Sequence, residues 1–251
     1  MRLQLAQDAK YEPPAHILTW CWREFERDLK QMQIQKAMKK EKKDRYIFID
    51  ESGTLPDPKG DVIVVAVVAT VTPDKLITPT SQTRKLLNPK NKKVSELKFY
   101  TAGDKTRLAF LNELVSLDID IFILTIQKSG QNIPDTSENF AILCWLLLEE
   151  CILFYGDSIK QVIFDKHFHR QKDISDFNKK LLQLVNKKLE IKHAESINDT
   201  RVNTADMVAG SALYFHTDKD KQFYKILENR IISEKVLHWK EAKRRVYEIG
   251  Q

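Results

Sequence analysis

The sequence has 251 residues, of which 42% are hydrophobic and 30% are charged, which is enough for one substantial core. Its longest apolar run, residues 141–148, is far shorter than the roughly 20 residues of a membrane-spanning helix, so we expect no membrane protein. The N-terminus carries no secretory signal, and Cys21, Cys144 and Cys151 are widely spaced; we expect reduced cysteines in a cytoplasmic protein.

The first part of the chain predicts a helical extension followed by a β-hairpin. Residues 1–44 form the extension, because apolar residues recur at helical spacing from residue 14 onward. Residues 46–50 are a short apolar run and residues 62–71 a β-branched run, separated by turn-forming Pro and Gly, which favours two antiparallel strands. Residues 73–95 contain three prolines and many Lys and Asn residues, so we expect a long basic loop.

Helices and strands alternate through the rest of the chain. We expect helices near residues 108–115, 137–156, 174–185 and 203–215, and strands at residues 119–127, 161–165 and around Ile191. Residues 45–217 then form one α/β domain: a mixed sheet that begins with the antiparallel hairpin and is flanked by helices on both faces. Residues 218–251 are expected to form a C-terminal helical segment that packs on this core.

Three aspartates stand where an apolar element begins or ends. Asp50 and Asp165 each close a predicted strand, and Asp206 lies in the first turn of a helix rich in small residues. Clustered carboxylates repel one another unless a cation lies between them, and oxygen ligands without His or Cys suit Mg²⁺ or Mn²⁺ better than zinc. The pattern therefore predicts a metal site. Structural roles explain the three aspartates equally well: Asp50 would start a turn, Asp165 would cap the following segment and Asp206 would stabilise a helix N-terminus.

Other polar residues are candidates for accessory roles. Glu51 follows Asp50 directly, and its side of the strand is undecided because Ser52 and Gly53 begin a turn. Glu96 and Lys98 alternate onto one face of a short segment, where they could supply a ligand and a phosphate contact or only a surface ion pair. His193 could orient a water or a phosphate near the metal.

The basic residues are unevenly distributed. The formal net charge is +6, and residues 84–98 hold six basic residues against one acid. Such a cluster suits a polyanion if the charges converge in space, and is otherwise a solvated surface. His167 and His169 are predicted to lie in a polar loop and to be solvated, because no second ligand pair follows at the spacing of a zinc site.

Four motifs in this order resemble the bacterial and phage family called domain of unknown function 3800. They are YIFIDESG at residues 46–53, SELK at 95–98, VIFD at 162–165 and TADMVAG at 204–210. Family members tend to have Gln-Leu-Ala-Asp where this chain has Asn-Thr-Ala-Asp at residues 203–206.

The resemblance implies a ribonuclease H-like fold, whose sheet starts with a hairpin and whose acids hold two Mg²⁺ or Mn²⁺ ions for phosphodiester hydrolysis. It implies that Asp50 bridges both ions, that Asp165 and Asp206 are the further ligands, and that Glu51 and Glu96 assist.

We therefore expect a nuclease that acts on nucleic acid, with Asp50, Glu51, Asp165 and Asp206 as its catalytic residues. Lys98 and the basic residues 84–93 would hold the phosphates. One alternative is a module of the same fold that binds nucleic acid or protein without cutting, the N-terminal helix serving as a partner or homodimer contact. Another is a haloacid dehalogenase-like phosphatase, because residues 50–55 resemble its Asp-x-Asp-Gly-Thr-Leu motif; however, Ser52 stands where the second carboxylate is needed.

Overall fold

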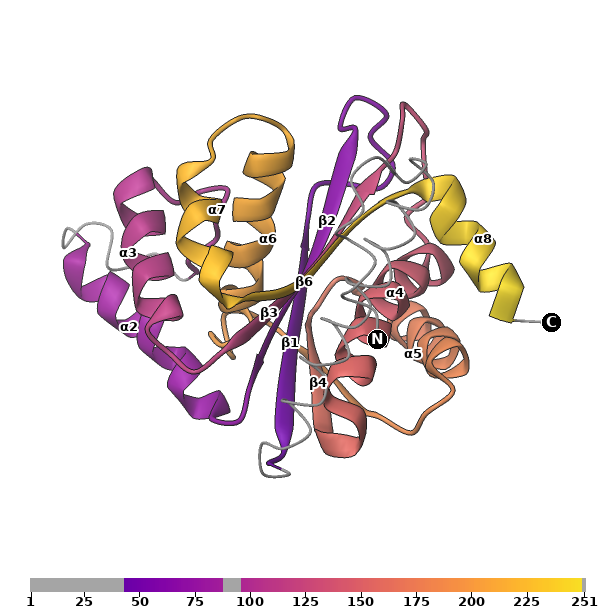
Figure 1. Cartoon of the computed structure of the whole chain (residues 1–251), viewed down its shortest axis with the longest axis horizontal. Helices are drawn as coiled ribbons and strands as arrows, with labels where there is room; N and C mark the ends of the chain where they lie inside the picture. Colours follow the sequence, from indigo (N-terminus) through magenta and orange to yellow (C-terminus); the bar gives the residue numbers. More distant parts are fainter. Residues whose placement is uncertain (1–42, 88–95, 250–251) are drawn as a thin grey trace, which may run out of the picture. The chain divides into compact units, whose positions relative to one another are not determined.

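The computed structural model of the protein describes residues 43–87 and 96–249 (Figure 1). These residues belong to one compact unit that begins at Lys43. The predicted N-terminal helix and residues 88–95 of the predicted basic loop lie outside the described residues.

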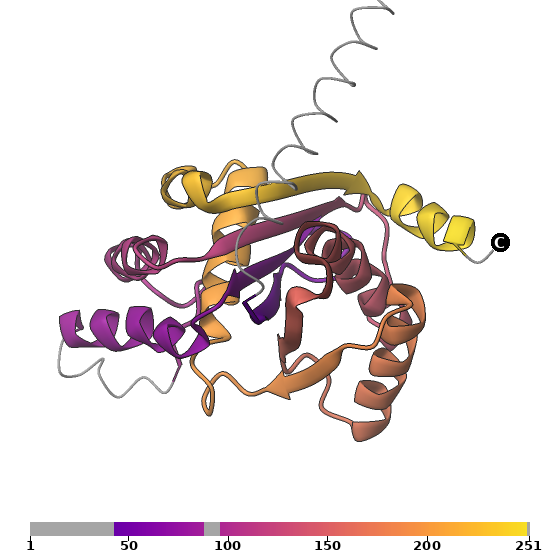
Figure 2. The same ribbon diagram turned by 60° about the horizontal axis from the view of Figure 1, so that its bottom comes forward.

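A six-stranded mixed sheet forms the centre of this unit. Its strands are β1 (Arg45–Ser52), β2 (Val62–Thr70), β3 (Asp120–Gln127), β4 (Ile159–Asp165), β5 (Glu190–Ala194) and β6 (Ile231–His238). The order across the sheet is β5-β4-β1-β2-β3-β6, so β5 and β6 lie at opposite edges (Figure 2). Within the described residues β2 alone runs against the others, because it pairs antiparallel with β1 and β3 and all other pairs are parallel.

The hairpin of β1 and β2 begins the sheet, as the sequence predicts. β2 is apolar and almost fully buried, and β1 is buried from Ile47 to Asp50, as expected for strands covered on both faces. The chain leaves β1 at Gly53, whose φ of 96° lies in the left-handed region. A Cβ at this position would lie 2.7 Å from the carbonyl oxygen of Val62, so the turn requires glycine for space as well as for conformation.

Helices cover both faces of the sheet, which confirms the predicted fold class. One face carries α2 (Ile77–Leu86), α3 (Asp104–Val115), α6 (Asn203–His216) and α7 (Gln222–Leu227), and the other carries α4 (Ser137–Tyr155), α5 (Gln171–Val185) and α8 (Trp239–Ile249) (Figure 1). Single-turn 3₁₀ helices cover Pro73–Leu76, Gly156–Ser158 and Glu228–Arg230. Each layer buries its own apolar cluster against the sheet, so the core lies on both sides of it.

Helix α4 is long and apolar enough to span a membrane by length and composition, the one such helix among the described residues. Its side chains form much of the buried cluster between the sheet and α5, as in a core helix. Cys144 and Cys151 are buried in it as free thiols, as the sequence predicts. The side chain of Thr136 caps its N-terminus by accepting a hydrogen bond from the amide of Asn139.

Two parts of the sequence were predicted with the wrong element. Residues 73–86 are helical instead of a loop, because Pro73 and Pro79 occupy first turns, where a missing N–H breaks no helical hydrogen bond. The C-terminal segment, expected to be helical, contains the edge strand β6 between α7 and α8. β6 alternates half-buried and exposed residues, a period-two pattern that the helical prediction overlooked.

Candidate active site

Strands β1 and β4 bring two of the predicted aspartates side by side. The two strands pair in parallel, with Ile49 opposite Phe164, so that Asp50 and Asp165 are the next residues on neighbouring strands. Adjacent strands are about 4.8 Å apart, which places the two carboxyl groups at the same edge of the sheet. Asp50 is buried, with 7% of its surface exposed, and its Oδ1 accepts the N–H of Glu51 at 2.8 Å.

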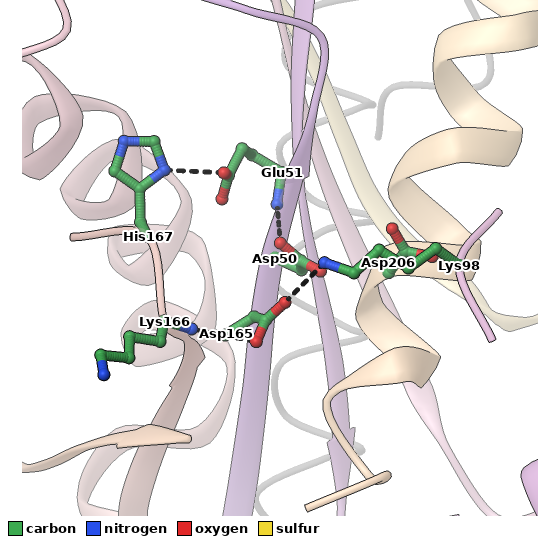
Figure 3. A pocket seen from close by; sticks show the side chains of 7 residues that line it. All are labelled: Asp50, Glu51, Lys98, Asp165, Lys166, His167 and Asp206. Atoms are coloured by element: carbon green, nitrogen blue, oxygen red, sulfur yellow. Dashed lines mark hydrogen bonds and ion pairs between the residues drawn. The ribbon is translucent and has the colours of Figure 1, made fainter. Parts of the chain in front are cut away.

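Helix α6 delivers the third carboxylate. It packs against β1 and β2, and small residues such as Ala205 and Ala209 are fully buried on its sheet-facing side. Asp206, in the first turn, points toward Asp50 and Asp165 (Figure 3). The three aspartates therefore line one cavity of about 180 Å³, together with Glu51, Lys98, Lys166 and His167.

A close contact with α6 holds Lys98 at this cavity. The N–H of Phe99 donates to Asp206 Oδ2 at 2.6 Å, and the Phe99 ring lies where a side chain at position 210 would otherwise be. Arg107 fixes the other side of the ring: its guanidinium lies 4.4 Å from the ring centroid, and its Nε donates to the Phe99 carbonyl at 2.8 Å. Gly210 is therefore what allows the segment before α3 to reach the aspartates.

Burial and nearby negative charge raise the pKa values of Asp50 and Asp206. Burial is the largest cause for Asp50, followed by the charges of Glu51, Asp206 and Asp165, and together they raise its pKa well above the usual range. Burial also raises the pKa of Asp206 to about 7, although the Phe99 N–H and the Lys98 charge lower it. A cation between these carboxyl groups would stabilise the ionised forms of Asp50 and Asp206.

Lys98 supplies a positive charge in this structure. Its Nζ lies 3.5 Å from Asp165 Oδ2 (Figure 3) and 3.2 Å from Glu96 Oε1. Burial alone would lower the pKa of Lys98, but the charges of Asp165, Glu96 and Asp50 raise it above its ordinary value. The ammonium group is therefore held charged beside the carboxylates.

Glu51 lies on the opposite face of β1 from Asp50, because the strand continues through Ser52 and neighbouring residues alternate. Its Oε1 lies 2.7 Å from Nδ1 of His167, whose Nε2 lies 2.9 Å from Asp135 Oδ1. The imidazole stacks on the Phe140 ring with centroids 4.0 Å apart. Burial would lower the pKa of His167, but its hydrogen bonds and charge interactions with Glu51 and Asp135 raise it to about 9.

The prediction that His167 is solvated is therefore wrong, since His167 lines the cavity and is held by two carboxylates. Its position two residues after Asp165 gives no usable signal, because His167 contacts Phe140 of α4 and Glu51, which lies on the face of β1 opposite to Asp50. The partner Asp135, which precedes α4, gives no signal either, because its contact with His167 is made only in the folded chain.

The remaining candidates lie outside the cavity lining. Glu96 lies behind Lys98, where it accepts a hydrogen bond from the Ser196 hydroxyl. His193 lies in a second cavity instead of beside the aspartates, because it faces the α5 side of β5 and stacks on Phe164. Arg84 lies on α2 and is not part of the cavity lining.

Comparisons with known proteins find distant likenesses among solved structures and no match by sequence. No protein-family model matches the sequence, and no curated protein matches it, so the resemblance to domain of unknown function 3800 stays a prediction.

Among solved structures, the chain is similar to Bst-RNase HIII in complex with Mn²⁺, with 16% identity and a TM-score of 0.42, over 77% of this chain and 56% of that one. It is similar to Archaeoglobus fulgidus RNase HII, solved in complex with PCNA, with 14% identity and a TM-score of 0.36, over 73% and 77%. It is also similar to Pyrococcus horikoshii ribonuclease H2, with 12% identity and a TM-score of 0.40, over 73% and 76%.

The chain thus spans about half the length of the RNase HIII that it matches. Likenesses of this degree add nothing to the assignment of the site, which rests on the arrangement of the side chains.

Proposed function

We propose that the protein is a nuclease that hydrolyses phosphodiester bonds with the help of divalent metal ions. The observation that carries the proposal is the convergence of Asp50, Asp165 and Asp206, from two strands and a helix, at one cavity. Carboxylates gathered in this way, with a charged lysine beside them, are suited to a phosphate substrate held through metal ions.

The donor set fits a hard cation. The three aspartates offer only oxygen ligands, and their mutual repulsion would be relieved by Mg²⁺ or Mn²⁺. Among the described residues, no three acidic, His or Cys side chains are already arranged around an ion position. Two bound ions would supply an activated water and stabilise the leaving oxygen.

The other residues of the cavity have roles that follow from their contacts. We assign to Lys98 the contact with a phosphate oxygen, because its ammonium group already lies within reach of a carboxylate of the site. Glu51 is proposed as an auxiliary acid whose orientation His167 and Asp135 fix through hydrogen bonds. Glu96 is proposed to orient Lys98 through their ion pair.

The main rival is a module of the same fold that binds nucleic acid or protein without cutting it. The phosphatase alternative has less support, because Ser52 continues β1 and brings no carboxylate two positions after Asp50. The role of the N-terminal extension in pairing with a second chain stays a prediction.

The proposal is tested by incubating the full chain with labelled single-stranded and duplex RNA and DNA in Mg²⁺ or Mn²⁺. We expect cleavage that stops with EDTA and falls about a hundredfold or more in Asp50→Asn and Asp206→Asn. Asp176→Asn, on the exposed face of α5, is the matched control and should cut normally. Undiminished cleavage by Asp50→Asn would refute the proposal, and binding of nucleic acid without any cleavage would favour the rival.

A further inference from the structure

A second cavity lies directly beside the carboxylate cavity. It measures about 570 Å³, within the range of sites that bind small molecules, and we call it the His193 cavity. Its lining includes Gln171, Ile174 and Asn178 of α5, and His193 of β5.

The two cavities share a wall. Lys166 lines both of them. Asp165, which lines the first cavity, is the register partner of Ala194, which lines the second, so these two lining residues lie about one strand spacing apart. A group bound at the aspartates would therefore have its covalent neighbour at the mouth of the His193 cavity.

The charges around the His193 cavity are paired. Glu195 accepts a hydrogen bond from Lys166 Nζ at 2.6 Å. Asp199 binds the Arg201 guanidinium through both carboxylate oxygens, at 2.7 and 2.6 Å. Because each acid of the lining has its own cation, the cavity does not suit a phosphate group, which binds where positive charge is in excess.

The uncharged groups of the cavity suit a flat, hydrogen-bonding ligand. His193 Nε2 lies 2.8 Å from Asn178 Oδ1, so Nε2 carries the proton and Nδ1 is left as an acceptor. The Nδ2 group of Asn178 and the amide of Gln171 add donors and a further acceptor, and Ile174 gives an apolar surface. Amide side chains with these donor and acceptor pairs are those that read the edges of nucleobases.

We propose that the His193 cavity binds the base and sugar of the nucleotide next to the phosphate that is cut. This inference rests on the proposed nuclease function and adds the form of the substrate. A base can enter such a cavity only if it is unpaired and unstacked, so the substrate is a single-stranded segment or an unpaired end.

The test compares binding of a base-bearing strand with binding of its backbone alone. Full-length protein is titrated, with Ca²⁺ present, into labelled single-stranded DNA and RNA hexanucleotides and into a hexamer of abasic units that keeps the phosphates. Fluorescence anisotropy gives the Kd values. We expect the wild-type protein to bind a base-bearing strand about tenfold more tightly than the abasic one.

Asn178→Leu keeps the size of the side chain and removes its hydrogen bonds, so it should reduce this preference to about two- to threefold. Asn112→Leu, at an exposed position of α3, is the matched control and should keep the full preference. Gln171→Ala, at the exposed start of α5, gives a second variant if Asn178→Leu does not fold.

Equal binding of both strands by the wild type, or an unchanged preference in the folded cavity variants, would overturn the inference. Cleavage decides the two proposals separately. Tighter binding of the base-bearing strand without cleavage supports base binding in the His193 cavity and refutes the nuclease function. Cleavage by a protein that binds both strands equally supports the nuclease function and refutes base binding.

Discussion

Gly210→Ala tests whether the contact between α6 and Phe99 is as close as the structure indicates. The added methyl carbon would lie 2.3 Å from Cγ and 2.6 Å from Cβ of Phe99, far inside van der Waals contact. The ring cannot move aside easily, because it is buried and packs edge-on against Tyr214 and Phe223, with centroids 4.9 and 5.5 Å away, and beneath the Arg107 guanidinium.

The sign of the effect distinguishes this account from ordinary helix propensity. An alanine in place of glycine inside an unhindered helix would stabilise the protein by about 0.5–1 kcal/mol. Overpacking against Phe99 should outweigh this gain and destabilise the protein by about 1–3 kcal/mol. The free energy of unfolding, from urea titration followed by circular dichroism, measures the difference.

A second substitution provides the control. Phe99→Ala removes Cγ and Cδ1, the two atoms nearest to the added carbon, so Gly210→Ala should cost less in a Phe99→Ala background than in the wild type. A stabilised Gly210→Ala protein, or costs that simply add in the double variant, would refute the contact.

Three further predictions concern buried charges, each measured as the free energy of unfolding in EDTA. Asp206 has its pKa raised from 3.8 to about 7, so its ionisation lowers the stability of the folded protein as the pH rises through that range. Asp206→Asn should therefore be about 2–4 kcal/mol more stable than the wild type at pH 8. A stability difference between the two proteins that is no larger at pH 8 than at pH 4 would contradict this. His167 has its pKa raised from 6.5 to about 9, so its contribution to the free energy of unfolding is complete below pH 6.5 and is lost as the pH rises through 9. His167→Gln should be less stable than the wild type by up to about 3 kcal/mol at pH 6 and by much less at pH 10. A loss of stability that does not depend on pH would contradict this prediction. Lys128 is fully buried, and its ammonium group donates hydrogen bonds to the carbonyls of Thr54 and Asp57 in the turn after β1. Lys128→Met should lower the free energy of unfolding by about 1–3 kcal/mol, because these buried acceptors lose their donor. An unchanged stability would show that the turn does not depend on Lys128.

The sequence predicts those parts of the site that depend on strand ends. Asp50 and Asp165 each close an apolar run, and a parallel pairing of the two runs is enough to bring them together. Asp206 is predictable for a similar local reason, since the small residues after it indicate a helix that approaches the sheet closely.

Residues brought together by loops were harder to predict. The side of Glu51 depends on whether β1 ends at Asp50 or continues through Ser52, a difference of two residues at a strand boundary. His167 reads as a loop residue in sequence, because its partners Asp135 and Glu51 lie 32 and 116 positions away. His193 was expected near the metal because acids follow it, but alternation along β5 turns it toward α5.

The same limits explain the errors in the fold. Within the part of the chain that the structure describes, β6 pairs only with β3, far away in sequence, and its Glu and Lys residues interrupt the apolar pattern of a strand. Prolines suggested a loop before α3, although proline is compatible with a first helical turn.

Calorimetric titration with Mn²⁺ tests the central claim most directly, because it asks whether the three aspartates bind metal before any substrate is identified. We predict that the full chain binds Mn²⁺ with release of protons from the raised-pKa carboxyl groups, and that Asp50→Asn loses this binding while Asp176→Asn retains it. Equal binding of Mn²⁺ by the wild type and Asp50→Asn, or no binding by either, would contradict the assignment of this cavity as a metal site.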